Sequence, residues 1–386
     1  MTLLKEDTKL LLDWYDAERR ILPWREDPTP YHVWVSEIML QQTRVEAVKD
    51  YYARFLATLP DVASLAAADE DTYLKIWEGL GYYSRVRNMH KAAVTIMDEY
   101  GGEIPSTAKE LQKLSGIGEY TAAAIASIAF QQPVSSVDGN LLRVYARRNL
   151  YRENIKDPAA KKVAYDYYME RMPEDRPGDY NQALMDLGAT VCLPNGEPEC
   201  FRCPWADLCE AHKQGVELEV PVVPAKKARR IEHRNVYRVH CGDVLLLSKR
   251  PDTGLLAGLY EFPNDLLVPE KKAAETSEKS SGNSSERSST KLTKKQVAEL
   301  SQNALDRFLS DNDLTPVSVF PLPAAKHIFS HVEWHMTGYD IEVESLAQLP
   351  SEAAGSSDAD RADLFACHLS EVDRYSIPNA FDAFKF

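Results

Sequence analysis

Four cysteines crowded into one short segment constrain the fold of this chain more than any other feature. They follow the pattern Cys-x7-Cys-x2-Cys-x5-Cys between Cys192 and Cys209, and the other two cysteines lie far from them. In a chain without a secretory signal, such crowding indicates a metal site rather than disulfides. Zinc usually takes two separated Cys-x-x-Cys pairs and this segment holds one, so a cubane iron-sulfur cluster is the favoured occupant and zinc the alternative. The predicted ligands are Cys192, Cys200, Cys203 and Cys209.

Length and charge set broad limits on organisation and partners. The chain has 386 residues, more than a single hydrophobic core usually serves, which predicts two domains. Its first segment is charged and no long uncharged apolar run follows, so we expect no signal peptide, no membrane span and a cytoplasmic location. A net charge of −14 argues against a DNA partner on average, but basic clusters predict a local basic patch. Its candidate members are Arg85, Arg87, His90, Lys91, Arg143, Arg147, Arg148 and Arg152.

The pattern of apolar residues changes near residue 215. Before it, apolar residues recur every three or four positions, as in helices, and after it prolines and a basic run over 216–234 predict a linker. Strand-like stretches over 235–241, 243–250 and 327–343, with a helix over 295–309, predict an α+β module. A hairpin turn is expected at Gly242–Asp243. Residues 271–294 are rich in serine, glutamate and lysine and are predicted to form a disordered surface loop.

A glycine-containing turn between two helical segments is a candidate phosphate-binding site. An apolar segment ends at Ser115-Gly116-Ile117-Gly118, and an alanine-rich segment follows. The glycines permit a tight turn and expose backbone N–H groups at a helix N-terminus, where a phosphate can dock. The pattern is typical of a helix-hairpin-helix, although a plain connection between helices explains it equally well.

Two carboxylates from separate segments suit the cleavage of a glycosidic bond. Glu37 lies among apolar residues of a helical stretch, where burial would raise its pKa and let it deliver a proton. Asp138 precedes a helical run. Glycosidic cleavage needs one acid for the leaving group and one anion facing an oxocarbenium-like sugar. The alternatives are a solvated helix glutamate and a plain N-cap aspartate.

Taken in order, these motifs resemble the helix-hairpin-helix glycosylase superfamily and, within it, the MutY adenine glycosylases. The resemblance rests on Glu37 with Gln41-Gln42-Thr43, Leu80-Gly81-Tyr82-Tyr83, the Gly-Ile-Gly turn, Val137-Asp138-Gly139-Asn140 and the cysteine segment. It covers residues 1–215 closely and the rest loosely. The first cysteine gap is seven residues where the family usually shows six, which enlarges the loop without removing a ligand.

The resemblance implies an all-α helix-hairpin-helix glycosylase core with a [4Fe-4S] loop, followed by an α+β Nudix-like C-terminal domain over 235–386. Within the helical catalytic region, 1–215, it implies a six-helix module over about 25–136. A cluster module would combine 1–24 with 137–215.

The resemblance also implies a base-flipping enzyme, a monomer associated with the nucleoid, that excises adenine from duplex DNA opposite 8-oxoguanine or guanine. Glu37 would protonate the adenine at N7, and Asp138, held by Asn140 with Tyr120 near both, would stabilise the sugar cation. Tyr120 stands where the bifunctional endonuclease III relatives carry a nucleophilic lysine, so a monofunctional enzyme is expected. The implied substrate and DNA contacts are Trp24, Arg25, Leu40, Gln42, Tyr82, Gly116, Gly118 and Gln182.

The second domain resembles the Nudix-like module with which this family reads 8-oxoguanine. Residues 254–263 begin like a Nudix segment, but no Arg-Glu-x-x-Glu-Glu helix follows, so no magnesium-dependent hydrolysis is expected. Phe329, Ser330 and His331 match the family's lesion-reading loop; the alternative is a strand with exposed polar side chains.

Three other functions compete with adenine excision. A glycosylase-lyase acting on oxidised pyrimidines would lack its lysine, because Tyr120 takes that place, and would not explain the second domain. A non-catalytic DNA-binding protein would not need both Glu37 and Asp138. A Nudix hydrolase with a helical appendage would lack its metal-binding helix.

Overall fold

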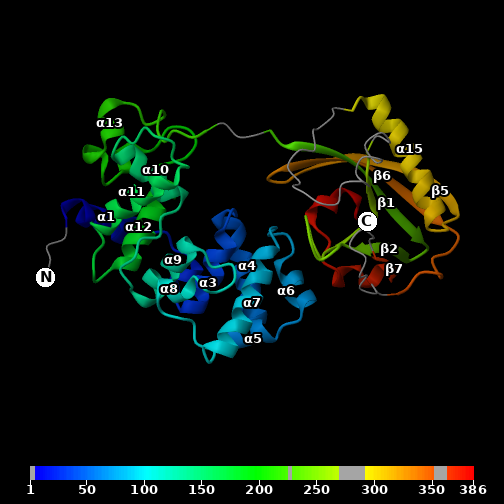
Figure 1. The fold of residues 1–386 in the computed structure, drawn as a ribbon, viewed down its shortest axis with the longest axis horizontal. Coiled ribbons are helices and arrows are strands. Elements are labelled where there is room, and N and C mark those ends of the chain that lie inside the picture. Colours follow the sequence, from blue (N-terminus) through cyan, green and yellow to red (C-terminus); the bar gives the residue numbers. More distant parts are fainter. Residues whose placement is uncertain (1–4, 225–227, 269–291, 352–362) are drawn as a thin grey trace. The chain divides into compact units, whose positions relative to one another are not determined.

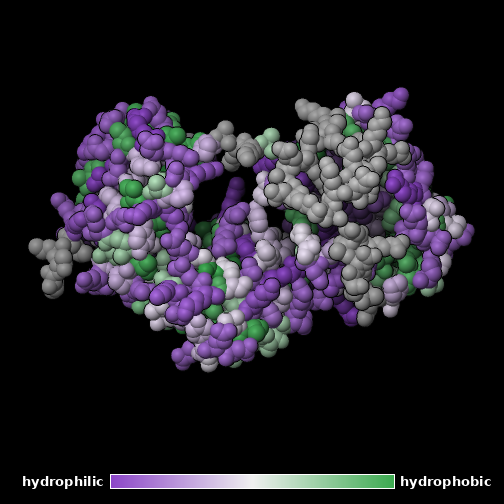
Figure 2. Space-filling view, viewed as in Figure 1, coloured by the Kyte–Doolittle hydropathy of each residue, from purple (hydrophilic) through white to green (hydrophobic). Residues whose placement is uncertain are grey.

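The computed structural model describes residues 5–224, 228–268, 292–351 and 363–386, and it divides into two compact units, Met1–Lys226 and Lys227–Phe386 (Figure 1). The first unit is helical and the second is a sheet with one long helix, as the sequence pattern predicts. None of the described helices combines the length and apolar character that a membrane crossing requires. On the face shown in Figure 2, hydrophilic side chains dominate and apolar ones form small patches.

Eight of the thirteen described helices of the first unit begin where the sequence supplies a side-chain cap or a proline. At six of them a Thr or Asp side chain accepts a backbone N–H of the first turn, and four have proline at one of their first two positions. The helices are α1 (Glu6–Glu18), α2 (Pro23–Glu26), α3 (Pro30–Leu40), α4 (Val45–Thr58), α5 (Val62–Ala67), α6 (Glu70–Trp77), α7 (Ser84–Glu99), α8 (Ala108–Leu111), α9 (Glu119–Phe130), α10 (Gly139–Arg148), α11 (Pro158–Met169), α12 (Pro177–Thr190) and α13 (Glu210–Gln214), with 3-10 turns at Cys200–Arg202 and Ala206–Leu208.

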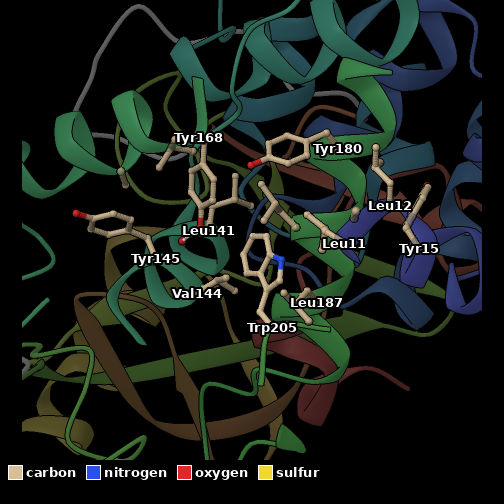
Figure 3. Close-up of a cluster of buried hydrophobic side chains, with 14 of the residues drawn as sticks. Leu11, Leu12, Tyr15, Leu141, Val144, Tyr145, Tyr168, Tyr180, Leu187 and Trp205 are labelled. Carbon is tan, nitrogen blue, oxygen red and sulfur yellow. Dashed lines mark hydrogen bonds between the residues drawn. The ribbon is translucent and has the colours of Figure 1, made fainter. Parts of the chain in front are cut away.

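The N-terminal helix packs against segments that come much later in the chain. Leu11, Leu12 and Tyr15 of α1 are buried with side chains of α10, α11 and α12 in one apolar cluster (Figure 3). Trp205 of the cysteine segment is 1% exposed in the same cluster, and its indole N–H donates to the Asp7 carbonyl at 2.8 Å. Burial of a large apolar side chain stabilises a fold by roughly 1.5–3 kcal/mol. The cluster therefore anchors the cysteine segment to the helices that carry the candidate site.

The second unit is a mixed sheet in the order β3-β2-β1-β6-β5, with β4 paired to β1 and β7 to β2. Among the described strands, β1 and β6 pair in parallel and the other pairs are antiparallel. Helix α15 packs on one face, where Phe308 stacks on Tyr237 with ring centroids 4.1 Å apart, and a second apolar cluster around Trp334 and Phe381 covers the other. The elements are β1 (Arg230–Cys241), β2 (Val244–Lys249), β3 (Tyr260–Glu261), β4 (Asn264–Leu266), α15 (Lys294–Asp311), β5 (Pro316–Ile328), β6 (Val332–Val343) and β7 (Asp363–His368), followed by 3-10 turns at Leu369–Arg374 and Asn379–Phe384.

Several local predictions can be compared with these elements. The hairpin turn is confirmed, because Cys241 pairs with Val244 and Gly242 has φ 56°. The single strand predicted over 327–343 is wrong, because β5 ends at Ile328 and β6 begins at Val332. β1 begins at Arg230, inside the segment predicted as a linker, since pairing with β6 extends that far. Of the loop predicted over 271–294, residues 271–291 lie outside the described residues.

Candidate active site

Glu37 lies on a buried helix rather than at the surface. Thr29 caps α3, Pro30 opens it, and Glu37 is 6% exposed. Its carboxylate accepts a hydrogen bond from the Tyr120 hydroxyl at 2.8 Å. Burial raises the pKa of Glu37 to about 7; the Tyr120 hydroxyl and Arg25 act against this rise, while nearby negative charge adds to it. Glu37 can therefore hold a proton near neutral pH.

The glycine turn before α9 places Tyr120 against Glu37. Gly116 has φ 75°, and a Cβ there would lie 2.6 Å from the Asn88 side chain, so only glycine fits without rearrangement. Gly118 is the N-cap residue of α9, and Tyr120 follows in the first turn. Burial, with the nearby carboxylates, raises the pKa of Tyr120 well above its ordinary value. Tyr120 is therefore a neutral hydrogen-bond donor.

Asp138 is the N-cap residue of α10, so the capping interpretation is correct. One carboxylate oxygen accepts the backbone N–H groups of Asn140 and Leu141, and the other accepts the Asn140 amide, all at 2.8 Å. Burial raises the pKa of Asp138, and these three hydrogen bonds oppose the rise because they favour the charged form. Arg143 donates to the Asn140 amide oxygen at 2.9 Å and to the Cys192 carbonyl at 2.8 Å. Capping does not exclude a second role, because Asp138 also borders a pocket.

Glu37, Tyr120 and Asp138 border one pocket of about 200 Å³. The pocket collects side chains from helices that are distant in sequence, chiefly α2, α3, α9, α10 and α12. Five residues that the resemblance implies as catalytic or substrate-binding line the same pocket: Trp24, Arg25, Leu40, Asn140 and Gln182.

Two arginines of this pocket are held by an aspartate that the sequence analysis missed. Asp186 on α12 is 1% exposed and accepts both terminal nitrogens of Arg25, at 2.7 and 2.9 Å, and Nε of Arg20 at 2.7 Å. Such a charge-assisted fork fixes both guanidinium groups at the pocket wall. Arg25 and Asp186 lie 161 residues apart, so no local pattern could have indicated the pair. Arg20, by contrast, stands in a visible basic segment before Trp24.

Gln42 and Tyr82 lie apart from this pocket. With Gly116 they border a second hollow of about 250 Å³. Both side chains are exposed, and both backbones are left-handed, with φ 60° for Gln42 and 49° for Tyr82. That conformation costs roughly 1–2 kcal/mol for a residue with a side chain. Exposed residues held under such strain are typical of functional surfaces.

The predicted basic patch is wrong for three of its arginines. Arg85, Arg143 and Arg147 are at most 8% exposed, and their guanidinium groups donate to backbone carbonyls. Arg87 of the same patch pairs with Glu70. Buried carbonyl groups at helix ends and loops need donors, which explains why these arginines turn inward.

The four predicted cysteine ligands lie in the segment that follows α12, and all are free and partly buried. Burial raises the pKa of Cys200 to about 11 and that of Cys203 to about 12. Among the described residues, three potential metal ligands lie close together: the ligand atoms of Cys200, His212 and Glu217 are within 4.8 Å of one another. This group contains one of the four predicted cysteine ligands. Four free thiols in one short segment fit a metal centre, since thiolates are ligands of both zinc and iron-sulfur clusters.

In the second unit, Phe329, Ser330 and His331 form the loop between β5 and β6. Phe329 is anchored, because its ring lies 4.8 Å from that of Trp334 and its N–H donates to the Val332 carbonyl at 2.9 Å. Ser330 and His331 are exposed, with Oγ and Nδ1 3.2 Å apart. The strand alternative is therefore wrong. The packed ring of Phe329 supports a loop that exposes the side chains of Ser330 and His331 to solvent.

Comparison with known proteins identifies the family to which this chain belongs. Residues 35–167 match the HhH-GPD superfamily of base excision DNA repair proteins, and residues 236–384 match the NUDIX domain. An adenine DNA glycosylase of Buchnera aphidicola is 34% identical over 264 residues, which cover 67% of this chain and 74% of that protein. This chain belongs to the adenine DNA glycosylase family. Within the family, the Schizosaccharomyces pombe protein is 36% identical, with 66% of this chain and 68% of that protein covered. The rat adenine DNA glycosylase is 39% identical, with 67% and 60% covered.

The alignments with several family members span only part of those proteins. They cover 60% of the rat protein, 61% of the mouse protein and 48% of the Arabidopsis protein.

Proposed function

We propose that this protein is a monomeric, monofunctional DNA glycosylase that flips adenine out of duplex DNA opposite 8-oxoguanine or guanine and hydrolyses its N-glycosidic bond. One observation carries the proposal: a buried pocket brings together Glu37, bonded to the Tyr120 hydroxyl, and Asp138, whose oxygens accept three N–H groups. Glycosidic cleavage requires one carboxyl group that donates a proton and one that faces the sugar cation, and these two carboxyl groups have different hydrogen-bond partners. Membership of the family supports adenine as the base.

Glu37 is the proton donor in this proposal. With a pKa of about 7 it carries a proton in a large share of molecules at neutral pH. The proton passes to N7 of the adenine as the bond between the sugar and the base breaks, so the base leaves neutral. General acid catalysis of this kind contributes ~10²–10⁴-fold.

Asp138 is the anion of the pair. Its three N–H partners favour the charged form, whereas Glu37 accepts one side-chain hydrogen bond within the described residues, from the phenol of Tyr120. A fixed carboxylate in a water-poor pocket stabilises the sugar cation electrostatically or bonds to it until water adds. Asn140 and Tyr120 hold the two carboxyl groups in place.

The other lining residues accommodate the expelled base and the duplex. Trp24, Leu40 and Arg25 form walls of the pocket, and Gln182 offers an amide to the adenine. Gln42 and Tyr82 occupy the space in the base stack that the adenine leaves. The backbone N–H groups at Gly116 and Gly118 donate hydrogen bonds to a DNA phosphate.

Tyr120 makes the enzyme monofunctional. Among the described residues that line the pocket there is no lysine, so the Schiff-base route to strand cleavage has no amine to begin it.

The loop Phe329–His331 reads the 8-oxoguanine. Ser330 and His331 are exposed and can exchange hydrogen bonds with the oxidised base, and Phe329 fixes the loop that presents them. Excision and lesion reading are thus assigned to separate units.

Cys192, Cys200, Cys203 and Cys209 hold a [4Fe-4S] cluster in this proposal. The support is a set of four free thiols in one segment that holds a single Cys-x-x-Cys pair, whereas zinc usually takes two such pairs. When bound, such a cluster supplies iron–thiolate bonds that cross-link the segment.

Metal analysis tests the cluster. The purified protein should be yellow-brown with about four irons per chain, and serine at any of the four positions should lower that content. Cys241→Ser and Cys367→Ser are matched controls that should leave it unchanged. One zinc per chain without iron would contradict the assignment.

One assay tests the function as a whole. Duplexes containing 8-oxoguanine:adenine, guanine:adenine, undamaged pairs or an oxidised pyrimidine are incubated with the protein, with and without borohydride. We expect free adenine and heat-labile sites from the first two only, with little covalent adduct. Release of an oxidised pyrimidine with efficient trapping would favour the lyase alternative, and no released base from any duplex would refute the proposal.

A further inference from the structure

Arg85 joins the two loops that carry Gln42 and Tyr82. One terminal nitrogen donates to three carbonyls at the end of α3, those of Ile38, Met39 and Gln41, at 2.8–2.9 Å. The other donates to the carbonyls of Leu80 and Gly81, at 3.1 and 3.0 Å, and lies 3.4 Å from the Thr43 hydroxyl.

The acceptors of Arg85 directly flank the two left-handed residues. The Gln41 carbonyl precedes Gln42, and the Gly81 carbonyl precedes Tyr82. Arg85 also lies over the Tyr82 ring, 5.7 Å from its centroid, and its backbone N–H donates to the Tyr82 carbonyl at 2.9 Å. The last carbonyls of a helix have no partner within that helix, so a buried guanidinium can serve as their cap. The same group then fixes where the chain turns at Gln42.

We propose that Arg85 is a positioning residue for base extrusion, which clamps both loops so that Gln42 and Tyr82 are already set to enter the stack. This inference rests on the proposed function, because it assigns a task to the side chains that replace the expelled adenine. Holding both loops in advance removes the ordering cost that they would otherwise carry at the moment of extrusion. A lysine cannot substitute, because a single ammonium group has three donors at one point, whereas the guanidinium reaches six acceptors from two loops.

Extrusion can be measured separately from chemistry with 2-aminopurine in place of the adenine opposite 8-oxoguanine. Its fluorescence rises when the base leaves the stack. Arg85→Lys keeps the charge and should lower the extrusion rate about tenfold or more, since several hydrogen bonds to a charged donor are lost. Arg87→Lys, two residues along α7, is the matched control. It should change the extrusion rate less than about twofold, because a lysine can still form the ion pair with Glu70.

The decisive measurement repeats Arg85→Lys in a background with Gln42→Ala and Tyr82→Ala. If Arg85 acts through those side chains, its loss should cost less than about twofold there, because interacting positions are not additive. An equal cost in both backgrounds would show a general structural role and overturn the proposal, as would near-normal extrusion by Arg85→Lys.

A milder variant covers the case in which Arg85→Lys does not fold, as judged by circular dichroism. Trp77→Phe removes the indole N–H that donates to the Gly81 carbonyl at 3.1 Å and keeps an aromatic ring beside Arg85, whose guanidinium lies 5.2 Å from the Trp77 ring centroid. It should slow extrusion about two- to threefold in the native background and not in the alanine background; equal effects in both would overturn the clamp. Failure of the proposed function has a different signature, since the unchanged protein would then release no adenine from the 8-oxoguanine:adenine duplex.

Discussion

The pocket around Glu37 and the loop Phe329–His331 are built in opposite ways. In the pocket Glu37 is buried, Tyr120 and Asp138 are partly buried, all three are held by hydrogen bonds, and the two carboxyl groups have raised pKa values. In the loop, Ser330 and His331 are exposed, and the Phe329 ring is anchored against Trp334. Bond cleavage needs a dry site fixed in advance, whereas reading a base needs exposed donors and acceptors on a rigid support. Substitutions in the pocket should therefore alter the excision rate, and substitutions in the loop should alter the preference for 8-oxoguanine:adenine over guanine:adenine.

The largest effect is expected at the two carboxyl groups. Glu37→Gln keeps the shape but has no proton to give, and Asp138→Asn removes the charge that faces the sugar. Each should lower single-turnover excision by ~10²–10⁴-fold while duplex binding persists. Glu46→Gln, on the exposed face of α4, is the control. A variant that kept its excision rate, or lost binding in step with activity, would show that its residue is structural.

The same burial should make Glu37 costly for stability at high pH. Below its ordinary pKa of 4.5 both folded and unfolded chains are protonated, so there is no penalty. As pH rises towards about 7 the unfolded chain loses its proton first, and folding is disfavoured by up to roughly 3 kcal/mol. Glu37→Gln should therefore be more stable than the unchanged protein at pH 8 and about equal at pH 4. Urea unfolding at both values checks this, and equal stability at pH 8 would contradict the buried acid.

A smaller effect is expected in the pH dependence of excision. The rate should fall as pH rises through about 7, because Glu37 then gives up its proton. Tyr120→Phe removes a donor that favours the charged form of Glu37, so the pKa of Glu37 rises and the fall moves to higher pH. Relative to its own rate at pH 6, the variant should be several-fold more active at pH 8 than the unchanged protein. A fall that moved to lower pH would contradict the assigned hydrogen bond.

The smallest effect is expected at the loop. Ser330→Ala and His331→Ala should each lower the preference for 8-oxoguanine:adenine over guanine:adenine by about two- to tenfold, the worth of one ordinary hydrogen bond. The excision rate on guanine:adenine should hardly change. Ser318→Ala, on the exposed side of β5, is the control. If the loop variants slowed excision from both duplexes equally, the assignment of excision and lesion reading to separate units would be wrong.

Elements with strong local signals were predictable in detail. The helix predicted over 295–309 spans Lys294–Asp311, because Thr293 and Gln296 form a capping box at its start. The strand-like alternation missed the break between β5 and β6, because Phe329 and its neighbours continue that alternation; the resemblance alone indicated a loop there. The arginines of the predicted patch were misjudged for a related reason. Whether a guanidinium meets solvent or a buried carbonyl depends on residues far away in sequence, such as Ile38 for Arg85.

The sequence by itself determined the two-part organisation, the cysteine segment and the candidates Glu37 and Asp138, because spacing and residue type are local properties, and the family resemblance added Tyr120. Only the tertiary structure decided that Glu37 is buried against Tyr120, that Asp186 holds the two arginines of the pocket and that Arg85 bridges two loops. A pKa and a hydrogen bond depend on what packs around a group, and that is set by contacts between helices that are distant in the chain.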